Sequence, residues 1–184
     1  ELGIELDGAA SAELVKKVNE LESVGYVFEA ADASLELLIR RATGGVPDYF
    51  GVESYRVSSY HREGVVAPGG GGVELTNEAT VKLWIGEDRR IAVGEGNGPV
   101  NALDSALRTA LNGHFPGLSD IHLVDYRVRV LDTATGTEAV TRVLIESSDG
   151  DESWFTVGAS ANVIEASWIA LVDSIVFGLL RGAG

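Results

Sequence analysis

A glycine turn that occurs twice, 64 residues apart, is the feature that most constrains how this chain can fold. The first copy, at residues 94–103, has the sequence GEGNGPVNAL, and the second, at residues 158–167, has the sequence GASANVIEAS. The same offset aligns Ala106 with Ala170 without a gap. Each copy is predicted to close a strand and open a helix, and Pro99 suits the first helical turn, where a missing N–H is tolerated. A repeated strand–turn–helix unit predicts an internal pseudo-two-fold.

Strand-like alternation of apolar residues surrounds both turns. It predicts three strands and a helix in each half, at residues 49–62, 79–85, 89–93 and 99–111, and again at 121–131, 138–146, 153–157 and 162–180. Most connections between strands are short, which favours antiparallel pairing. We therefore predict an α+β fold of two pseudo-symmetric βββα units, each an antiparallel sheet with a helix on one face. Repeat 1 is expected at about 49–113 and repeat 2 at about 121–181, and the loop at 63–74 absorbs the longer first half.

Two further helices are predicted before the first repeat. Apolar residues recur at helical spacing over residues 11–24 and 29–41, and Gly44, Gly45 and Pro47 end the second helix. This helical hairpin of about 35 residues is too short to hold a core of its own. We therefore expect residues 1–45 to be a helical linker or subdomain and residues 46–184 to be the main domain. The hairpin either packs on that domain or joins it to another one, and the pattern leaves both alternatives open.

The composition restricts the possible partners. The chain has 14 Lys+Arg against 28 Asp+Glu, a net charge of −14, whereas binding to nucleic acid needs a basic surface. Its 184 residues include no cysteine, which excludes disulfides and thiolate metal sites and fits a cytoplasmic location. No apolar run of about 18 residues and no secretory signal are visible, so we expect no membrane span. Because the chain starts at Glu1 rather than at Met, we expect it to be a piece of a longer protein.

The sequence contains none of the familiar patterns of enzyme chemistry. The glycine spacing at residues 94–98 is G-x-G-x-G rather than G-x-G-x-x-G, and the strand before it belongs to a hairpin, which argues against a dinucleotide site. The histidines at 61, 114 and 122 form no metal motif, and no G-x-S-x-G elbow occurs. The four glycines at 69–72 precede no Lys-Ser/Thr pair, so a solvated loop is favoured over a phosphate cradle. We expect no catalytic residue and no metal ligand in this chain.

The first glycine turn is a candidate for binding. A turn at a helix N-terminus exposes backbone N–H groups that can hold a carboxylate, and glycine lets a ligand approach the backbone. The second turn has Ser160 and Asn162 where the first has Gly96 and Gly98, so the two turns are not equivalent. On spacing alone, a packing role for both turns and the binding of a small anion remain open.

Three segments of the chain resemble the C-terminal portion of the 2-isopropylmalate synthase and citramalate synthase family. They are residues 94–103 with Ala106-Leu107, residues 166–171 with Asp173-Ser174, and residues 25–34, which are similar to the helical linker of the citramalate-type branch. The likeness extends over essentially residues 11–181. In this family the region is a LeuA-type allosteric and dimerisation domain that binds leucine or isoleucine and feedback-inhibits an acyltransferase barrel. The resemblance implies that the N-terminal catalytic barrel, with its divalent metal and acetyl-CoA, is missing from this chain, which itself needs no cofactor.

The resemblance also assigns effector-binding roles residue by residue. The glycine turn, a V/L-D-Y strand, the strand along an apolar pocket and a helix residue that closes it correspond here to Gly94, Gly96 and Asn97, to Asp125 and Tyr126, to Thr141 and Val143, and to Leu103. An amino acid needs N–H donors for its carboxylate, which the backbone near Gly94 could supply, and an acceptor for its ammonium, which Asp125 or a free carbonyl could supply. Discrimination between methylene positions is worth only about 1–3 kcal/mol, so the sequence does not separate leucine from isoleucine, although the linker favours isoleucine. We expect a cytoplasmic homodimer whose helical hairpin passes the effector signal to the barrel.

Overall fold

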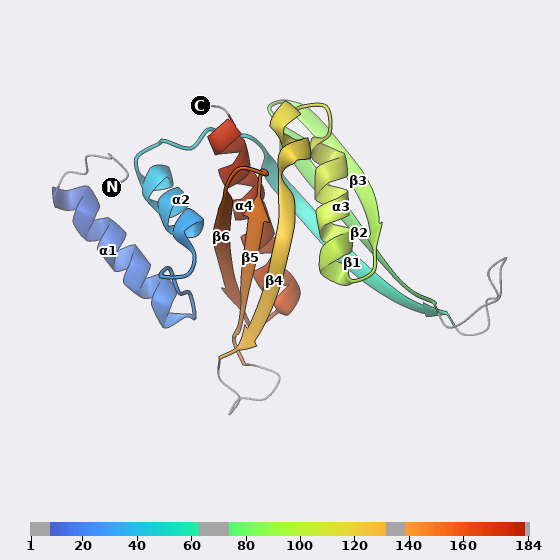
Figure 1. Cartoon of the computed structure of the whole chain (residues 1–184), viewed down its shortest axis with the longest axis horizontal. Coiled ribbons are helices and arrows are strands. Elements are labelled where there is room, and N and C mark those ends of the chain that lie inside the picture. Colours follow the sequence, from blue (N-terminus) through green and yellow to red (C-terminus); the bar gives the residue numbers. More distant parts are fainter. Residues whose placement is uncertain (1–7, 63–73, 132–138, 183–184) are drawn as a thin grey trace. The chain divides into compact units, whose positions relative to one another are not determined.

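The computed structural model of the chain describes residues 8–62, 74–131 and 139–182. The chain divides into two compact units, which we call the first-repeat unit (residues 48–115) and the second-repeat unit (residues 1–47 and 116–184). Each unit contains a three-stranded antiparallel sheet followed by a helix (Figure 1). The predicted α+β fold with two βββα units is therefore confirmed.

The first-repeat unit contains strands β1 (Gly51–Arg62), β2 (Glu74–Ile85) and β3 (Asp88–Gly96), in that order in the sheet, and helix α3 (Pro99–Leu111). Strand β2 begins five residues earlier than predicted. Alternate β2 residues, Ala79, Val81 and Leu83, are fully buried, and α3 buries Leu103 and Leu107. Figure 1 shows α3 lying along one face of this sheet. The amphipathic period of α3 and the two-residue period of β2 thus meet in one small core.

The second-repeat unit repeats this arrangement with β4 (His122–Val130), β5 (Thr141–Ser148), β6 (Ser153–Ser160) and α4 (Val163–Gly182). A 3₁₀ helix, η1 (Pro116–Asp120), which the sequence did not indicate, precedes β4. The core beneath α4 includes Val143, Ile145, Leu171 and Ile175, each at most 1% exposed. The predicted start of the middle strand, at residue 138, lies outside the described residues.

Helices α1 (Gly8–Ser23) and α2 (Asp32–Ala42) belong to the second-repeat unit. Helix α2 follows the free edge of β6, where the Asp32 carboxylate accepts the N–H of Phe155 at 3.2 Å and the Ser34 hydroxyl accepts the N–H of Val157 at 2.9 Å. Phe28 and Val157 form a buried cluster on the sheet face away from α4. The hairpin therefore packs on the second repeat, and side chains satisfy a strand edge that would otherwise be open.

An ion pair joins α2 to α4. Arg41 Nη2 donates to Asp173 Oδ1 at 2.8 Å, and the Asp173 side chain is only 15% exposed. Burial raises the pKa of Asp173 above its ordinary value, although Arg41 acts in the opposite direction. Desolvation disfavours the carboxylate more than the partly exposed guanidinium favours it.

Acidification is expected to stabilise the unmodified chain relative to an Asp173→Asn variant. The folded state binds the Asp173 proton more tightly than the unfolded state does, because the folded pKa lies above 3.8. The contribution of this group is therefore present below about pH 3.8 and is lost as the pH rises through the folded pKa. Urea unfolding of both proteins at a series of pH values measures it as the difference of two free energies. The lowered pKa values of Glu53 and Asp149 give the opposite slope in both proteins and cancel, so identical pH dependence would contradict the expectation.

By length and composition alone, helix α4 is long and apolar enough to cross a membrane. The sequence pattern had predicted no membrane-spanning helix, because polar residues interrupt its apolar run. Of its most apolar window, 61% is buried inside the structure. Apolar residues surround most of α4 because it packs on β5 and β6 and also contacts α2. A helix that is apolar on most sides is typical of a buried core helix.

Candidate functional site

Both glycine turns lie where a helix passes directly over a strand. A Cβ atom on Gly94 would lie 2.2 Å from the backbone N of Ala106, and one on Gly158 would lie 2.0 Å from the carbonyl O of Ala166. Gly96 is similarly crowded by the first turn of α3, at 2.5 Å. Side chains do not tolerate such distances, so these glycines allow α3 and α4 to pack on the backbone of β3 and β6. The repeated glycines therefore have a packing role in both units.

The N-terminus of α3 has no side-chain cap. Its N-cap residue is Gly98, which has an extended backbone (φ −151°, ψ 167°), and the next residue, Pro99, has no N–H. In the described part of the chain, no side chain accepts the N–H groups of Val100 and Asn101 that follow. These donors and the positive end of the helix dipole are therefore available to an external anion.

The N-terminus of α4 is capped by its own residues. The Ser160 hydroxyl accepts the N–H of Asn162 at 3.1 Å, and Asn162 Oδ1 accepts the N–H of Ile164 at 2.9 Å. The Glu165 carboxylate, in the first helical turn, accepts a hydrogen bond from Ser160 at 2.6 Å. An acidic residue in this position also satisfies the helix dipole. The two turns therefore share a packing role but differ in their capacity to bind an anion.

Two asparagines hold the first turn in place, and neither was predicted. Asn101 Oδ1 accepts the N–H of Asn97 at 3.2 Å, so this predicted donor is used within the chain. Asn77 is 1% exposed; its Nδ2 donates to the carbonyl O of Gly96 at 3.5 Å, and its Oδ1 accepts from the Ser59 hydroxyl at 2.7 Å. Asparagine is depleted in strands, and a buried one needs partners. The only sign of this role in the sequence is that Asn77 lies among polar residues just before the apolar part of the strand.

The other predicted residues are mostly buried. Leu103 and Val143 are 0% exposed and Thr141 is 8% exposed, each beneath the helix of its own unit. Tyr126 reaches from β4 to α4, where its hydroxyl lies 2.8 Å from Ser167 Oγ. Because Ser167 donates its own proton to a backbone carbonyl of α4, the tyrosine is the donor in this pair.

Asp125 was predicted as one of two alternative acceptors for the ammonium group of an effector, the other being a free carbonyl. Its Oδ1 accepts the N–H of Tyr126 at 2.8 Å, and its Oδ2 accepts Nε of Arg127 at 2.5 Å. Both oxygens therefore already have one partner each. The eight predicted residues form two groups, with Gly94, Gly96, Asn97 and Leu103 in the first-repeat unit and Asp125, Tyr126, Thr141 and Val143 in the second-repeat unit.

Strand β4 carries an exposed apolar strip, which we call the β4 strip: Val124, Val128 and Val130. These valines are 55%, 46% and 49% exposed. Contiguous apolar surface of this kind is typical of interaction sites. Of the predicted effector residues of this unit, Thr141 and Val143 are buried, whereas Asp125 and Tyr126 are partly exposed.

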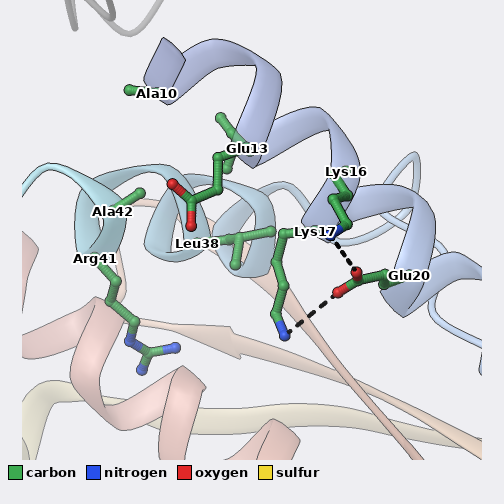
Figure 2. Close-up of a pocket in the computed structure, with 9 residues that line it drawn as sticks. Ala10, Glu13, Lys16, Lys17, Glu20, Leu38, Arg41 and Ala42 are labelled. Atoms are coloured by element: carbon green, nitrogen blue, oxygen red, sulfur yellow. Dashed lines mark ion pairs between the residues drawn. The ribbon is translucent and has the colours of Figure 1, made fainter.

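A groove of about 550 Å³ lies between α1 and α2 (Figure 2). Leu14 and Leu38 form its apolar wall, while Lys16 and Lys17 lie 3.8 and 4.0 Å from the carboxylate of Glu20. Exposed ion pairs of this length contribute little to stability. None of the eight predicted residues lines this groove. Within residues 8–62, 74–131 and 139–182, no group of three or more His, Asp or Glu side chains is placed to hold a metal ion.

Comparison with known proteins gives a consistent set of relatives. A sequence model of the family described as "LeuA allosteric (dimerisation) domain" matches residues 29–178. The (R)-citramalate synthase of Streptomyces coelicolor (strain ATCC BAA-471 / A3(2) / M145) is 50% identical over 184 residues, which cover 98% of this chain and 33% of that protein. The (R)-citramalate synthase of Aquifex aeolicus (strain VF5) is 49% identical over 183 residues, again 98% of this chain and 33% of that protein.

The 2-isopropylmalate synthase of the same Aquifex strain is 28% identical over 181 residues, which cover 98% of this chain and 31% of that protein. The chain therefore spans about a third of the length of the curated relatives it matches.

Proposed function

Since the chain belongs to the family of LeuA allosteric (dimerisation) domains, we propose that it is the regulatory portion of an acetyl-CoA-dependent 2-oxo-acid acyltransferase of the citramalate or 2-isopropylmalate synthase type. In this proposal it binds a branched-chain amino acid, isoleucine or leucine, as a feedback inhibitor. It forms a homodimer in the cytoplasm, and the N-terminal catalytic barrel of the parent protein holds the divalent metal and acetyl-CoA.

The uncapped N-terminus of α3 is the observation that carries the effector-binding part. The N–H groups of Val100 and Asn101 and the helix dipole suit the carboxylate of an amino acid. At the pseudo-equivalent end of α4, Ser160, Asn162 and Glu165 of the chain occupy this position. The two helix N-termini therefore differ in the number of N–H donors that remain for an anion.

The chain is more similar to a citramalate synthase than to a 2-isopropylmalate synthase, and this favours isoleucine over leucine as the effector. Of the two Aquifex aeolicus enzymes, the citramalate synthase is 49% identical to this chain and the 2-isopropylmalate synthase 28%. The segment at residues 25–34, which resembles the citramalate-type linker, includes Phe28 and Ser34, and both contact β6 in the second-repeat unit. The proposal therefore places the chain in the citramalate branch.

The β4 strip supports dimerisation. Half-exposed valines on a strand at the edge of a sheet are a liability for a monomer, because they offer apolar surface beside unpaired backbone groups. A second copy covering the strip would remove both. The proposed signal then runs through the α1–α2 hairpin, which is attached to β6 and α4 by Asp32, Ser34 and Arg41.

Thermal melts of the chain with isoleucine, leucine, valine or no addition test the effector proposal. A ligand at about 100 times its dissociation constant adds about 2.7 kcal/mol to the free energy of unfolding. For a chain of this size the melting temperature should rise by roughly 5–10 °C with the true effector. The absence of any shift in a folded dimer would contradict effector binding and leave a purely structural dimerisation module, for which the crowded glycines already provide a reason.

A matched pair of variants at Gly98 locates the site. A Cβ atom there meets nothing within 4 Å, and the backbone is extended, so both substitutions fold. Gly98→Asp supplies its own N-cap carboxylate, which should stabilise the free chain by a few tenths of a kcal/mol, roughly 0.3 kcal/mol, and abolish the ligand-induced shift. Gly98→Ala adds no acceptor and should keep the shift. A full shift in Gly98→Asp would mean that the carboxylate binds elsewhere.

A further inference from the structure

A small pocket lined by three arginines lies on the second-repeat unit. Its volume is about 190 Å³, and its main lining residues are Val27 and Ala30 from the α1–α2 connection, Leu144 from β5, and Arg127, Arg129 and Arg142 from β4 and β5. The cross-strand partners Arg127 and Leu144 share a face with Val157, which the helical hairpin covers. The hairpin therefore forms one wall of the pocket and the sheet forms its floor.

The arginines of this pocket are arranged unfavourably for an empty site. Arg129 and Arg142 are direct cross-strand neighbours, and like charges in this position destabilise a sheet. Burial lowers the pKa of Arg142, and the neighbouring charge of Arg129 lowers it further. Arg142 Nε donates to the carbonyl O of Gly25 at 2.5 Å, an uncharged partner. Among the described residues Arg129 has no ion-pair partner, while Arg127 is paired with Asp125.

The first repeat shows that the fold does not require this arginine pair. The residues at the corresponding positions of the first-repeat unit are Ser58 and Glu78, which are cross-strand neighbours in the same way. The counterpart of Arg127 is Arg56, on the repeated Tyr-Arg-Val segment. The second repeat thus places two positive charges directly opposite one another in a chain whose net charge is −14.

We propose that this pocket binds a short aliphatic carboxylate that carries no ammonium group. Guanidinium groups hold a carboxylate through paired hydrogen bonds, and an anion here would relieve the repulsion between Arg129 and Arg142. Val27, Leu144 and the apolar stems of the arginines surround the hydrocarbon chain. The ammonium of an amino acid would face the same positive charges, so this ligand is chemically distinct from the effector proposed for α3.

The size of the pocket limits the ligand. Sites for drug-sized molecules measure about 300–1,000 Å³, well above the 190 Å³ found here. A branched acid of about five carbons, such as 3-methylbutanoate, is a suitable probe. An acidic side chain of another protein offers the same carboxylate on a shorter stem, so the experiment includes N-acetyl-glutamate amide as a second source of the group.

Isothermal titration of the full chain at low ionic strength tests the pocket. Saturable binding of one 3-methylbutanoate per chain is expected, with affinity at least tenfold higher than for leucine, for 3-methylbutan-1-ol or for inorganic phosphate. Equal affinity for phosphate would overturn the aliphatic part of the proposal, and equal affinity for the alcohol would overturn the part played by charge. Binding of N-acetyl-glutamate amide without binding of 3-methylbutanoate would assign the pocket to a protein partner and overturn the small-ligand proposal.

Arg129→Met and Arg56→Met form a matched pair for this titration. Both arginines are exposed, so both variants should fold, and only the first lines the pocket. Arg129→Met should weaken binding of 3-methylbutanoate about tenfold or more, the size of one charge-assisted hydrogen bond, and Arg56→Met should leave it unchanged. Unchanged binding in Arg129→Met, or equal loss in both variants, would overturn the assignment. The thermal shift with isoleucine should survive in both variants, which keeps this test separate from the effector proposal.

Discussion

Replacing Gly94 by alanine is expected to lower the free energy of unfolding by about 3 kcal/mol, the upper end of the usual range for overpacking. The added methyl carbon would lie 2.2 Å from the N of Ala106 and 2.7 Å from the carbonyl O of Ala102. Both are backbone atoms of α3, so no side chain can rotate away to make room. The helix would have to lift from β3, and the buried contacts of Leu103 and Leu107 would loosen with it. Urea unfolding followed by circular dichroism measures the loss.

Gly98→Ala, four residues further along the same turn, is the control. It introduces the same methyl group into open space and should change the free energy of unfolding by no more than about 0.5 kcal/mol. If the two variants were equally stable, the close packing of α3 on β3 would be wrong. Because a Gly94 substitution is expected to disturb the fold itself, a loss of effector binding in such a variant would not locate the binding site.

Replacing Trp154 by alanine is expected to be still more damaging, at about 3–5 kcal/mol. The indole is 2% exposed, its ring centroid lies 5.8 Å from that of Phe177, and its Nε1 donates to the carbonyl O of Ser174 at 3.2 Å. The ring also lies against Gly178, where α4 has no side chain. Alanine would therefore leave a cavity between β6 and α4. Phenylalanine, which keeps most of the apolar contact and loses only the N–H donor, should cost less.

Trp84→Ala is the matched control for this substitution. Trp84 lies on β2 of the first-repeat unit and is 42% exposed, so its removal should cost roughly 1–2 kcal/mol, clearly less than the removal of Trp154. Unfolding curves of the two tryptophan variants under the same conditions provide the test. A loss of equal size in both would contradict the assignment of Trp154 to the core of the second-repeat unit.

Periodicity was sufficient to predict the arrangement of helices and strands. Alternation in β2 identified Val81, Leu83 and Ile85, but the strand also includes residues 74–78, whose polar members Thr76, Asn77 and Glu78 carry no apolar period. Asn77 is buried because Ser59 and Gly96 satisfy its amide, and such pairing across strands cannot be recognised in one segment alone.

The difference between the two glycine turns was predictable from the sequence, but their detailed contacts were not. The substitution of Ser160 and Asn162 for Gly96 and Gly98 indicated that the turns differ, and the structure explains the difference through capping at α4. The role of Asp125 could not be foreseen, because its carboxylate bonds to the next residue's N–H and to Arg127. Local hydrogen bonds of this kind depend on side-chain rotamers, which a sequence pattern does not determine.

The attachment of α2 to β6 has a consequence for how copies of the chain can join. Asp32 and Ser34 accept the N–H groups of Phe155 and Val157 on the outer side of β6, so a strand of another molecule cannot pair with this part of β6. The β4-β5-β6 sheet can be extended only through β4. Two copies that paired their β4 strands would leave no open edge in the joined sheet, so growth through this sheet would stop at two copies.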